Sequence, residues 1–354
     1  MVNLKDYICI VPFDNLQIHR DENFVCCPQW LDKPIPNKDT LVETWNGEEI
    51  VDIRKSILDG SYKYCDFKHC THLSELSVLK TPDKLTPIIH KSKFQSNDKE
   101  FYENQTGVVE RGPKNVELNF DMTCNYKCPS CRTDFYVSTI KQQKEIESKL
   151  KEIDDFSDSI ESIYSSTTGD PFASVPIRNY FRNFNPKKYK KLKNIHIHTN
   201  GSLWDKEMWD SMSPMHPYVH TCEISIDAAT KDTYENKTRV GGNWETIIKN
   251  LNFISTIDTI HRFKCSFVVQ KSNYKEMSLF VDLIKSIFGK KGTVFFCRLQ
   301  NWRSYTADEY VNQEINNTEH PEHMDFVTEF NKVCYDDYVR HNLHEFMVIN
   351  KKIV

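Results

Sequence analysis

Residues 116–131 read V-E-L-N-F-D-M-T-C-N-Y-K-C-P-S-C, an alternating strand-like run that leads directly into three closely spaced cysteines. Cys124, Cys128 and Cys131 are separated by three and then two residues, and no fourth cysteine follows nearby. Cysteine thiolates hold iron–sulfur clusters, and a [4Fe–4S] cluster normally takes four of them. A loop with three cysteines therefore indicates a [4Fe–4S] cluster with one iron open to a small molecule.

The position of this loop supports the same interpretation. It follows the first expected strand at its carboxyl end, where parallel α/β folds place their reactive groups. Zinc is the structural alternative, but a closed zinc site takes four ligands, commonly from two paired cysteine knuckles. Three cysteines without a nearby partner pair fit zinc poorly.

Strand-like runs alternate with amphipathic helical stretches from residue 115 onward. This order is typical of an α/β fold with a parallel sheet and right-handed crossovers, either doubly wound or a barrel. The expected strands are Val116–Asp121, Ser159–Thr168, Asn194–Asn200, Thr221–Asp227, Phe263–Gln270 and Thr293–Asn301, with helices at Lys141–Phe156, Trp244–Ile257 and Lys275–Phe288.

Several of these strands alternate polar and apolar residues. Side chains in a strand point to opposite faces in turn, whereas parallel strands covered on both faces usually read as continuous apolar runs. One polar face favours a curved, partly closed barrel with a polar lumen. In the last strand the expected apolar face holds Phe295, Cys297 and Leu299. His198 and Arg298 fall on the expected polar face, and we predict that they contact substrate.

The bulk composition narrows the class of protein. The chain has 354 residues, a net charge of −4 and a charged fraction of 27%, which gives no general nucleic-acid footprint. The start has no signal-peptide pattern, and no apolar run is long enough to span a membrane. We expect a cytoplasmic protein with neither nucleic acid nor membrane as a partner. A reducing cytosol excludes a disulfide framework for the twelve cysteines.

The chain resembles the radical S-adenosylmethionine (radical SAM) superfamily in the cysteine loop and in four further segments at expected strand ends. By this resemblance the fold is a partial (β/α)6 barrel of the TIM type. One departure is Ser130, which stands where the family often has an aromatic residue and weakens the expected packing on adenine. The four segments are T-T-G-D-P-F (Thr167–Phe172), H-T-N-G (His198–Gly201), S-I-D-A-A-T-K-D-T-Y-E (Ser225–Glu235) with T-R-V-G-G (Thr238–Gly242), and F-V-V-Q-K-S-N-Y-K-E-M (Phe267–Met277).

The resemblance implies a cofactor and a set of site residues. Cys124, Cys128 and Cys131 would hold a [4Fe–4S] cluster whose fourth iron is chelated by S-adenosylmethionine. One electron, from a flavodoxin- or ferredoxin-type donor, would cleave the sulfonium to give a 5′-deoxyadenosyl radical that takes hydrogen from the substrate. Ser225 and Asp227 have a structural alternative, because polar residues at strand ends often cap the next helix. The implied cofactor contacts are Gly169, Asp170, Pro171, Asn200, Ser225, Asp227 and Arg239.

The early cysteines resemble the auxiliary-cluster modules called SPASM or twitch domains. Four usable thiolates suffice for a second [4Fe–4S] cluster. Glu22 replaces the glycine expected in a turn, and the module precedes the barrel instead of following it. A zinc ribbon is the alternative, and His69 or His72 could replace a thiolate. The expected ligands are Cys9, Cys65, Cys70 and one of Cys26 and Cys27, with family turn spacing slightly in favour of Cys27.

These observations give an expected organisation and function. The auxiliary module should cover residues 1–78, a linker 79–112, the barrel 113–305 and a C-terminal extension 306–354. We expect an oxidoreductase-type radical SAM enzyme that acts on a small-molecule, sugar-like or peptide substrate and leads to oxidation or cross-linking. The alternatives are an epimerase or maturase of a peptide, and, from another class, a non-enzymatic iron–sulfur or zinc-binding protein.

Overall fold

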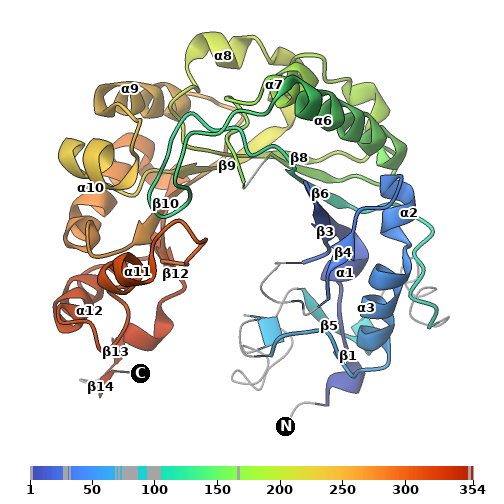
Figure 1. Cartoon of the computed structure of the whole chain (residues 1–354), viewed down its shortest axis with the longest axis horizontal. Helices are drawn as coiled ribbons and strands as arrows, with labels where there is room; N and C mark the ends of the chain where they lie inside the picture. The colour runs from blue at the N-terminus through green and yellow to red at the C-terminus, as the bar shows by residue number, and fades with distance from the viewer. Residues whose placement is uncertain are drawn as a thin grey trace. The chain divides into compact units, whose positions relative to one another are not determined.

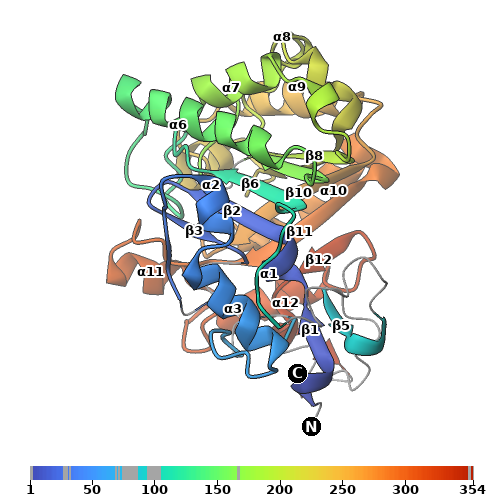
Figure 2. The ribbon, with the colours of Figure 1, turned by 90° about the vertical axis from the view of Figure 1, so that its right-hand side faces the viewer.

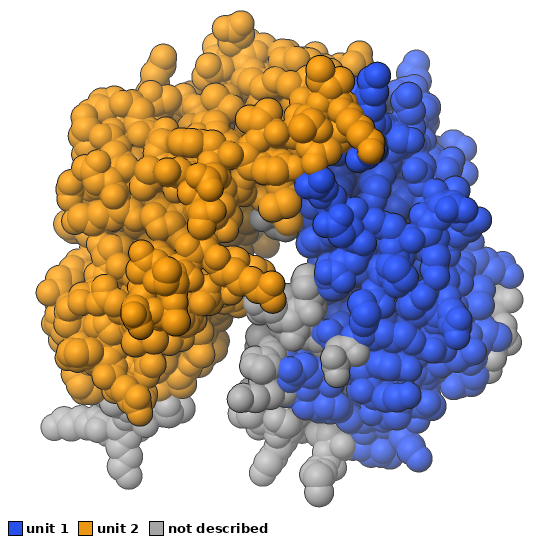
Figure 3. Space-filling model, viewed as in Figure 1, with its two compact units in different colours: residues 1–121, 144–165, 185–193 blue, residues 122–143, 166–184, 194–354 orange. Residues whose placement is uncertain are grey.

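The chain folds into parallel strands flanked by helices in its computed structural model (Figure 1). They confirm the expected mixed α/β class and are consistent with a partial (β/α) barrel. The chain forms two compact units (Figure 3): unit 1 holds residues 1–121, 144–165 and 185–193, and unit 2 holds residues 122–143, 166–184 and 194–354. The structure describes residues 3–26, 31, 33–67, 70, 72–73, 87–93, 105–165, 168–349 and 352–353.

Unit 1 is built on a mixed sheet with the strand order β7-β6-β2-β3-β4. Strand β6 (Asn115–Asn119) pairs in parallel with β7 (Ser162–Ser165) and with β2 (Asn15–His19). Strands β3 (Glu22–Phe24) and β4 (Ile35–Pro36) continue the sheet in antiparallel pairing. The N-terminal region thus adds a parallel strand beside β6, which the sequence pattern did not predict.

Unit 1 also holds a short antiparallel pair, β1 (Tyr7–Cys9) with β5 (Ile88–His90). Helix α3 (Glu48–Leu58) contacts α1 (Val11–Asp14) and β1, as Figure 2 shows. The side chain of Thr40 caps α2 (Leu41–Trp45) and pairs reciprocally with Glu43, so this helix has a fixed start. The expected helix at 141–156 is α6 (Ile140–Glu152) followed by the 3₁₀ turn η5 (Ile153–Phe156).

Unit 2 holds a fully parallel sheet with the order β12-β11-β10-β9-β8. The four longer strands correspond to four of the predicted strands. A bulge between Ile195 and His196 shifts the register of β8 against β9. The strands are β8 (Asn194–Thr199), β9 (Val219–Ser225), β10 (Arg262–Val269), β11 (Gly292–Arg298) and β12 (Val339–His341).

Helices α9 (Trp244–Ser255) and α10 (Met277–Phe288) cover one face of this sheet (Figure 1). Phe280 of α10 packs against Phe267 of β10 and Phe296 of β11, with ring centroids 4.9 and 6.4 Å away. The apolar residues of β8 and β9 are buried in the alternation that the sequence predicted. The polar residues of these strands lie on the opposite face.

The prediction that Arg298 lies on the polar face of its strand was wrong. Val294 and Phe296 are the buried residues of β11 on the α10 side, and Arg298 follows Phe296 at the same parity. Its guanidinium pairs with Glu345, and its backbone N–H donates to Asn342 at 2.8 Å. Arg298 therefore faces the C-terminal segment instead of the polar face of the sheet.

The other elements connect these layers. None of the helices within the described residues is long and apolar enough to cross a membrane. The remaining elements are η1 (Leu4–Asp6), η4 (Lys91–Lys93), α7 (Val175–Arg182), η6 (Pro186–Lys188), α8 (Lys206–Asp210), η7 (Ser213–Tyr218), the π-helical η8 (Thr233–Thr238), η9 (Tyr274–Glu276), η10 (Gly289–Lys291), α11 (Ala307–Gln313), α12 (His323–Asn331), η11 (His344–Phe346), β13 (Val348–Ile349) and β14 (Lys352–Ile353).

Candidate iron–sulfur and cofactor site

The three-cysteine loop lies entirely within unit 2. The backbone N–H of Cys124 donates to the carbonyl of Tyr136 at 3.0 Å, which closes the loop with an isolated antiparallel bridge. The N–H of Cys131 donates to the carbonyl of Cys128 at 2.9 Å and makes a tight turn. Cys124 and Cys128 are buried, whereas Cys131 is exposed. The loop thus presents two sheltered thiols and one that solvent reaches.

Each of the three sulfurs accepts a hydrogen bond from a different side-chain nitrogen. Asn200 Nδ2 donates to Cys124 Sγ at 3.8 Å. Arg239 Nη1 donates to Cys128 Sγ at 3.6 Å. Arg132 Nη2 donates to Cys131 Sγ at 3.7 Å. Hydrogen bonds to ligating sulfurs tune the potential of an iron–sulfur cluster, so these donors suit thiolate ligands.

The protonation state of the buried thiols follows from their surroundings. Burial raises the pKa of Cys128 to about 11, although the positive charge of Arg239 acts in the opposite direction. Burial also raises the pKa of Cys124. Both thiols therefore keep their protons in the metal-free chain at neutral pH. Because metal ligands must be thiolates, metal binding at this loop would release protons.

Asp170 holds the residues around Asn200 in place. Its carboxylate Oδ2 accepts from Thr199 Oγ1 at 2.7 Å and from the N–H of Asn200 at 2.8 Å, while Oδ1 accepts from the N–H of Phe172 at 3.0 Å. Its own N–H donates to the carbonyl of Thr123 beside the cysteine loop, at 2.8 Å. The buried Asp170 thus positions Asn200.

Asp227 holds Arg239. The two side chains form an ion pair of 2.7 Å between Nη2 and Oδ2, and Asp227 Oδ1 accepts from the N–H of Val268 at 2.7 Å. Asp227 has a φ of 58°, which aspartate tolerates better than most residues. Burial raises the pKa of Asp227, and Arg239 opposes that shift. Arg239 Nε is buried and has no hydrogen-bond partner within the described part of the chain.

The polar face of the unit 2 sheet carries a row of hydrogen bonds across the strands. His198 Nε2 lies 3.0 Å from Ser225 Oγ, which lies 3.2 Å from Ser266 Oγ. One step earlier in the strands, Glu223 and Lys264 form an ion pair of 2.8 Å. Burial lowers the pKa of His198. Burial alone would raise the pKa of Glu223, but the charges of His198 and Lys264 lower it to about 2. This face therefore carries an imidazole beside an ion pair.

The structure brings together most of the predicted cofactor residues. Pro171 is buried and Gly169 half-buried in the turn after β7, and Arg132 donates to the carbonyl of Thr168 at 2.7 Å. The sequence patterns did not predict three further residues of the site, which are Arg132, Lys264 and Ser266. A cation directly after the last cysteine marks Arg132 in the sequence. The alternation along β10 would have found the other two. Cys27, His69 and Thr167 lie outside the described residues.

Four of the early cysteines line one pocket in unit 1. Apolar side chains surround the thiols, and burial raises the pKa of Cys9 and of Cys65 to about 12 each. Strand β1 supplies Cys9, and an isolated bridge between Leu31 and Cys65 closes the far side. The structure thus gathers Cys26 with the other three thiols. The pocket is lined by Cys9, Val11, Pro12, Cys26, Leu31, Ile57, Tyr62, Cys65, Cys70, His72 and Leu73.

Within the described residues, no three His, Cys, Asp or Glu side chains converge on a point where they could hold a single metal ion. A [4Fe–4S] cluster bound by several cysteines does not need such convergence, because each thiolate binds a different iron.

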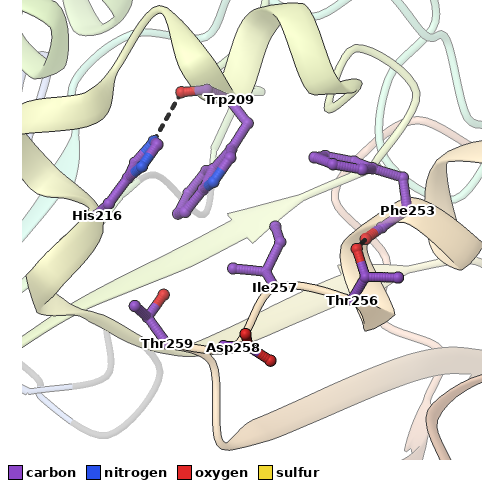
Figure 4. Close-up of a pocket in the computed structure, with 7 residues that line it drawn as sticks. All are labelled: Trp209, His216, Phe253, Thr256, Ile257, Asp258 and Thr259. Atoms are coloured by element: carbon purple, nitrogen blue, oxygen red, sulfur yellow. Dashed lines mark hydrogen bonds between the residues drawn. The ribbon is translucent and has the colours of Figure 1, made fainter.

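A further pocket of about 230 Å³ lies away from the cysteine loop in unit 2 (Figure 4). His216 stacks on Trp209 with ring centroids 3.8 Å apart, and His216 Nε2 lies 2.8 Å from the Trp209 carbonyl oxygen. None of the predicted site residues lines this pocket. Its lining is Trp209, His216, Phe253, Thr256, Ile257, Asp258 and Thr259.

Comparison with known proteins adds a family match. Residues 118–268 match the family model of the radical SAM superfamily. This range starts in β6 and ends in β10, so it includes the cysteine loop, Asp170, Asn200 and the Asp227–Arg239 pair. No curated protein matches the chain.

Several solved structures match the chain at low sequence identity. Streptococcus suis SuiB bound to S-adenosylmethionine is 15% identical, with 79% of this chain and 63% of that chain covered and a TM-score of 0.44. SuiB bound to the precursor peptide SuiA is 16% identical, with 66% and 52% covered and a TM-score of 0.41. Native anSMEcpe with bound AdoMet and Cp18Cys peptide is 16% identical, with 64% and 62% covered and a TM-score of 0.38. The chain spans about half to two thirds of the length of these proteins.

Proposed function

We propose that this chain, which belongs to the radical SAM superfamily through residues 118–268, cleaves S-adenosylmethionine reductively and oxidises or cross-links its substrate. The substrate would be a small molecule, a sugar-like metabolite or a peptide, and a flavodoxin- or ferredoxin-type protein would supply the electron. A second [4Fe–4S] cluster in unit 1 would accept an electron from the substrate radical.

The residues of the loop suit the cofactor that the family implies. Cys124, Cys128 and Cys131 would hold the [4Fe–4S] cluster, and one iron would remain for the amino and carboxylate groups of S-adenosylmethionine. Bound there, the pair would supply one-electron cleavage of the sulfonium and the 5′-deoxyadenosyl radical that removes hydrogen from the substrate. The unpartnered Nε of Arg239 is a cation donor suited to a carboxylate.

The observation that carries this proposal is the set of three N–H donors on the three sulfurs. Asn200 and Arg239 reach their sulfurs from distant parts of the chain, so these two donors converge through the tertiary structure, whereas Arg132 follows Cys131 directly in the sequence. Asp170 and Asp227 in turn hold two of these donors. His198, Ser225 and Ser266 would face the substrate from the polar side of the sheet.

Anaerobic reconstitution tests the proposal. Full loading of both sites should give about eight irons per chain, with a matching amount of sulfide. After reduction with dithionite, the protein should release 5′-deoxyadenosine from S-adenosylmethionine. The variant Cys334→Ala removes a buried thiol that belongs to neither site, so it should behave like the parent. Tight zinc without iron and without 5′-deoxyadenosine would instead identify a non-enzymatic metal protein.

The early cysteines support the second cluster. Cys9, Cys26, Cys65 and Cys70 line one pocket, and four thiolates satisfy a [4Fe–4S] cluster. A zinc ribbon would need the same four sulfurs to converge on one ion. Metal analysis of a variant with Cys124, Cys128 and Cys131 all changed to alanine separates these possibilities. We expect about four irons and no zinc in that variant.

Epimerisation is the second candidate, and one residue favours it. It would need a thiol that returns a hydrogen atom to the substrate radical. Cys297 shares the polar face of the sheet with Phe295, whose ring lies 4.2 Å from Lys264 Nζ. Burial raises the pKa of Cys297, so the thiol keeps its proton. In deuterated water, Cys297→Ala would then abolish deuterium uptake at the substrate carbon and leave 5′-deoxyadenosine formation in place.

A further inference from the structure

Arg54 is a fully buried cation in helix α3 of unit 1, with a relative exposure of 0%. Its Nε donates to the carbonyl of Pro12 at 2.8 Å, and its Nη1 donates to Asn46 Oδ1 at 3.0 Å and to the carbonyl of Gly107 at 3.3 Å. Its Nη2 is also buried and has no hydrogen-bond partner among the residues that the structure describes. These three hydrogen-bond partners of Arg54 are all uncharged.

The charge of Arg54 lacks a carboxylate of its own. The guanidinium carbon lies 4.1 Å from the ring of Trp45 and 5.9 Å from that of Phe13. Asp14 is the nearest acidic influence on Arg54, but it already pairs with Arg111 at 2.5 Å and with Lys114 at 3.3 Å. Arg54 therefore has no ion pair among the described residues, and the acidic group that influences it already pairs with two other cations. A buried charge without a compensating partner is destabilising, which suggests that an anion belongs nearby.

The cysteine pocket lies next to Arg54. Pro12, whose carbonyl accepts from Arg54, lines that pocket, and so does Ile57. Arg54 and Ile57 are three residues apart in α3, and such residues are neighbours on one helix face. Arg54 thus donates to one residue of the pocket lining and lies one turn of α3 away from another.

We propose that Arg54 is the built-in counter-charge of an anionic iron–sulfur cluster in this pocket and raises the reduction potential of that cluster. This inference rests on the proposed function, in which Cys9, Cys26, Cys65 and Cys70 hold the auxiliary cluster. Four thiolates give such a cluster a net negative charge, and reduction adds another. A buried cation in apolar surroundings stabilises the reduced form more than the oxidised form, because little solvent screens it.

The test measures the potential of the auxiliary cluster alone. The full chain carries alanine at Cys124, Cys128 and Cys131, and EPR follows a redox titration. Arg54→Met should lower the reduced-to-oxidised ratio about tenfold at fixed poise, which equals about 59 mV for one electron. Arg54→Lys keeps the charge and should shift the ratio much less. The matched control is Lys55→Met, which removes the exposed cation next in α3 and should leave the ratio unchanged.

A second variant keeps the test decisive if Arg54→Met fails to fold. Asn46→Asp retains the oxygen that accepts from Arg54 and places a negative charge beside it, so it should also lower the potential. Equal potentials in Arg54→Met, Asn46→Asp and Lys55→Met would overturn the inference. If the chain with alanine at Cys124, Cys128 and Cys131 binds zinc or no metal, the proposal of an auxiliary cluster is itself wrong. Metal analysis before the titration distinguishes these two failures.

Discussion

The two cysteine sites of this chain differ in what surrounds their sulfurs. In unit 2, side-chain N–H groups of Asn200, Arg239 and Arg132 donate to the three sulfurs of the loop. In unit 1, the thiols line a pocket together with apolar side chains, and the buried cation Arg54 donates to the carbonyl of Pro12 in that lining. Three side-chain nitrogens donate to the sulfurs of the loop, whereas mostly apolar side chains surround the thiols of the pocket.

This contrast is a physical reason for two different tasks. Hydrogen bonds to sulfur and solvent exposure both set the potential of an iron–sulfur cluster. The loop site has one exposed cysteine, and the buried Nε of Arg239 has no hydrogen-bond partner within the described residues, so the site suits a small molecule that carries a carboxylate. The apolar pocket suits storage or passage of an electron. We infer that the loop binds S-adenosylmethionine and that the N-terminal site serves electron transfer.

The largest expected effect separates the two sites. Cys128→Ala should abolish 5′-deoxyadenosine formation and remove about four irons, because three thiolates are the minimum for the loop cluster. Cys65→Ala should also remove about four irons but leave reductive cleavage of S-adenosylmethionine largely intact. Iron analysis and product quantification of both variants check this. Loss of cleavage in both variants would show that both sites are needed to cleave S-adenosylmethionine.

The next effect tests the support behind the donors. Asp227→Asn removes the negative charge that holds Arg239 while tolerating the positive φ. We expect cleavage to slow by about 10- to 100-fold, as for other groups that orient metal ligands. Asp232→Asn is the control, because Asp232 is exposed and pairs only with Lys237 at 2.9 Å among its ion-pair contacts. Equal rates in the two variants would show that Arg239 does not need its carboxylate.

A smaller effect is expected at the exposed sulfur. Arg132→Met removes the donor to Cys131, but water can replace a hydrogen bond at an exposed position. We expect cleavage to fall by about threefold to tenfold, below the range for buried supporting groups. Rates for Arg132→Met and Arg132→Lys, measured at equal iron content, provide the check. A drop as large as that of Asp227→Asn would show that exposure does not weaken this contact.

The smallest expected effect is a pH dependence that the two units share. Burial lowers the pKa of His196 in unit 2 and of His19 in unit 1 to about 4 each. The unfolded chain therefore binds more protons than the folded chain between pH 6.5 and 4. Stability is full above pH 6.5 and falls as the pH drops towards 4, by up to about 1.4 kcal/mol per pH unit for each histidine.

Urea unfolding between pH 7 and 5 measures this slope. His196→Gln should flatten the pH dependence by one histidine's share, and His19→Gln should do the same from the other unit. An unchanged slope in either variant would mean that the pKa of that histidine is the same in the folded and the unfolded chain.

Much of the site follows from local patterns. The cysteine spacing and the segments around Asp170, Asn200 and Arg239 are continuous motifs, and the alternation in β8 and β9 placed His198 and Ser225 on the polar face. The prediction for Arg298 was wrong for a physical reason. The phase of an alternating strand at its end depends on the helix that packs against it, and Phe280 of α10 selects Phe296 for the buried side.

The sequence alone predicted the chemistry of this protein: three cysteines whose spacing indicates a cluster with one open iron, and a parallel α/β pattern that places them at a strand end. Only the tertiary structure showed that Asn200 donates to Cys124 and Arg239 to Cys128, that Asp227 holds Arg239, and that Arg54 donates to Pro12 in the lining of the N-terminal pocket. Local spacing records the residue types that a cofactor needs. Contacts between residues up to 111 positions apart, such as Arg239 with Cys128, depend on strand pairing and packing, which leave no local pattern in the chain.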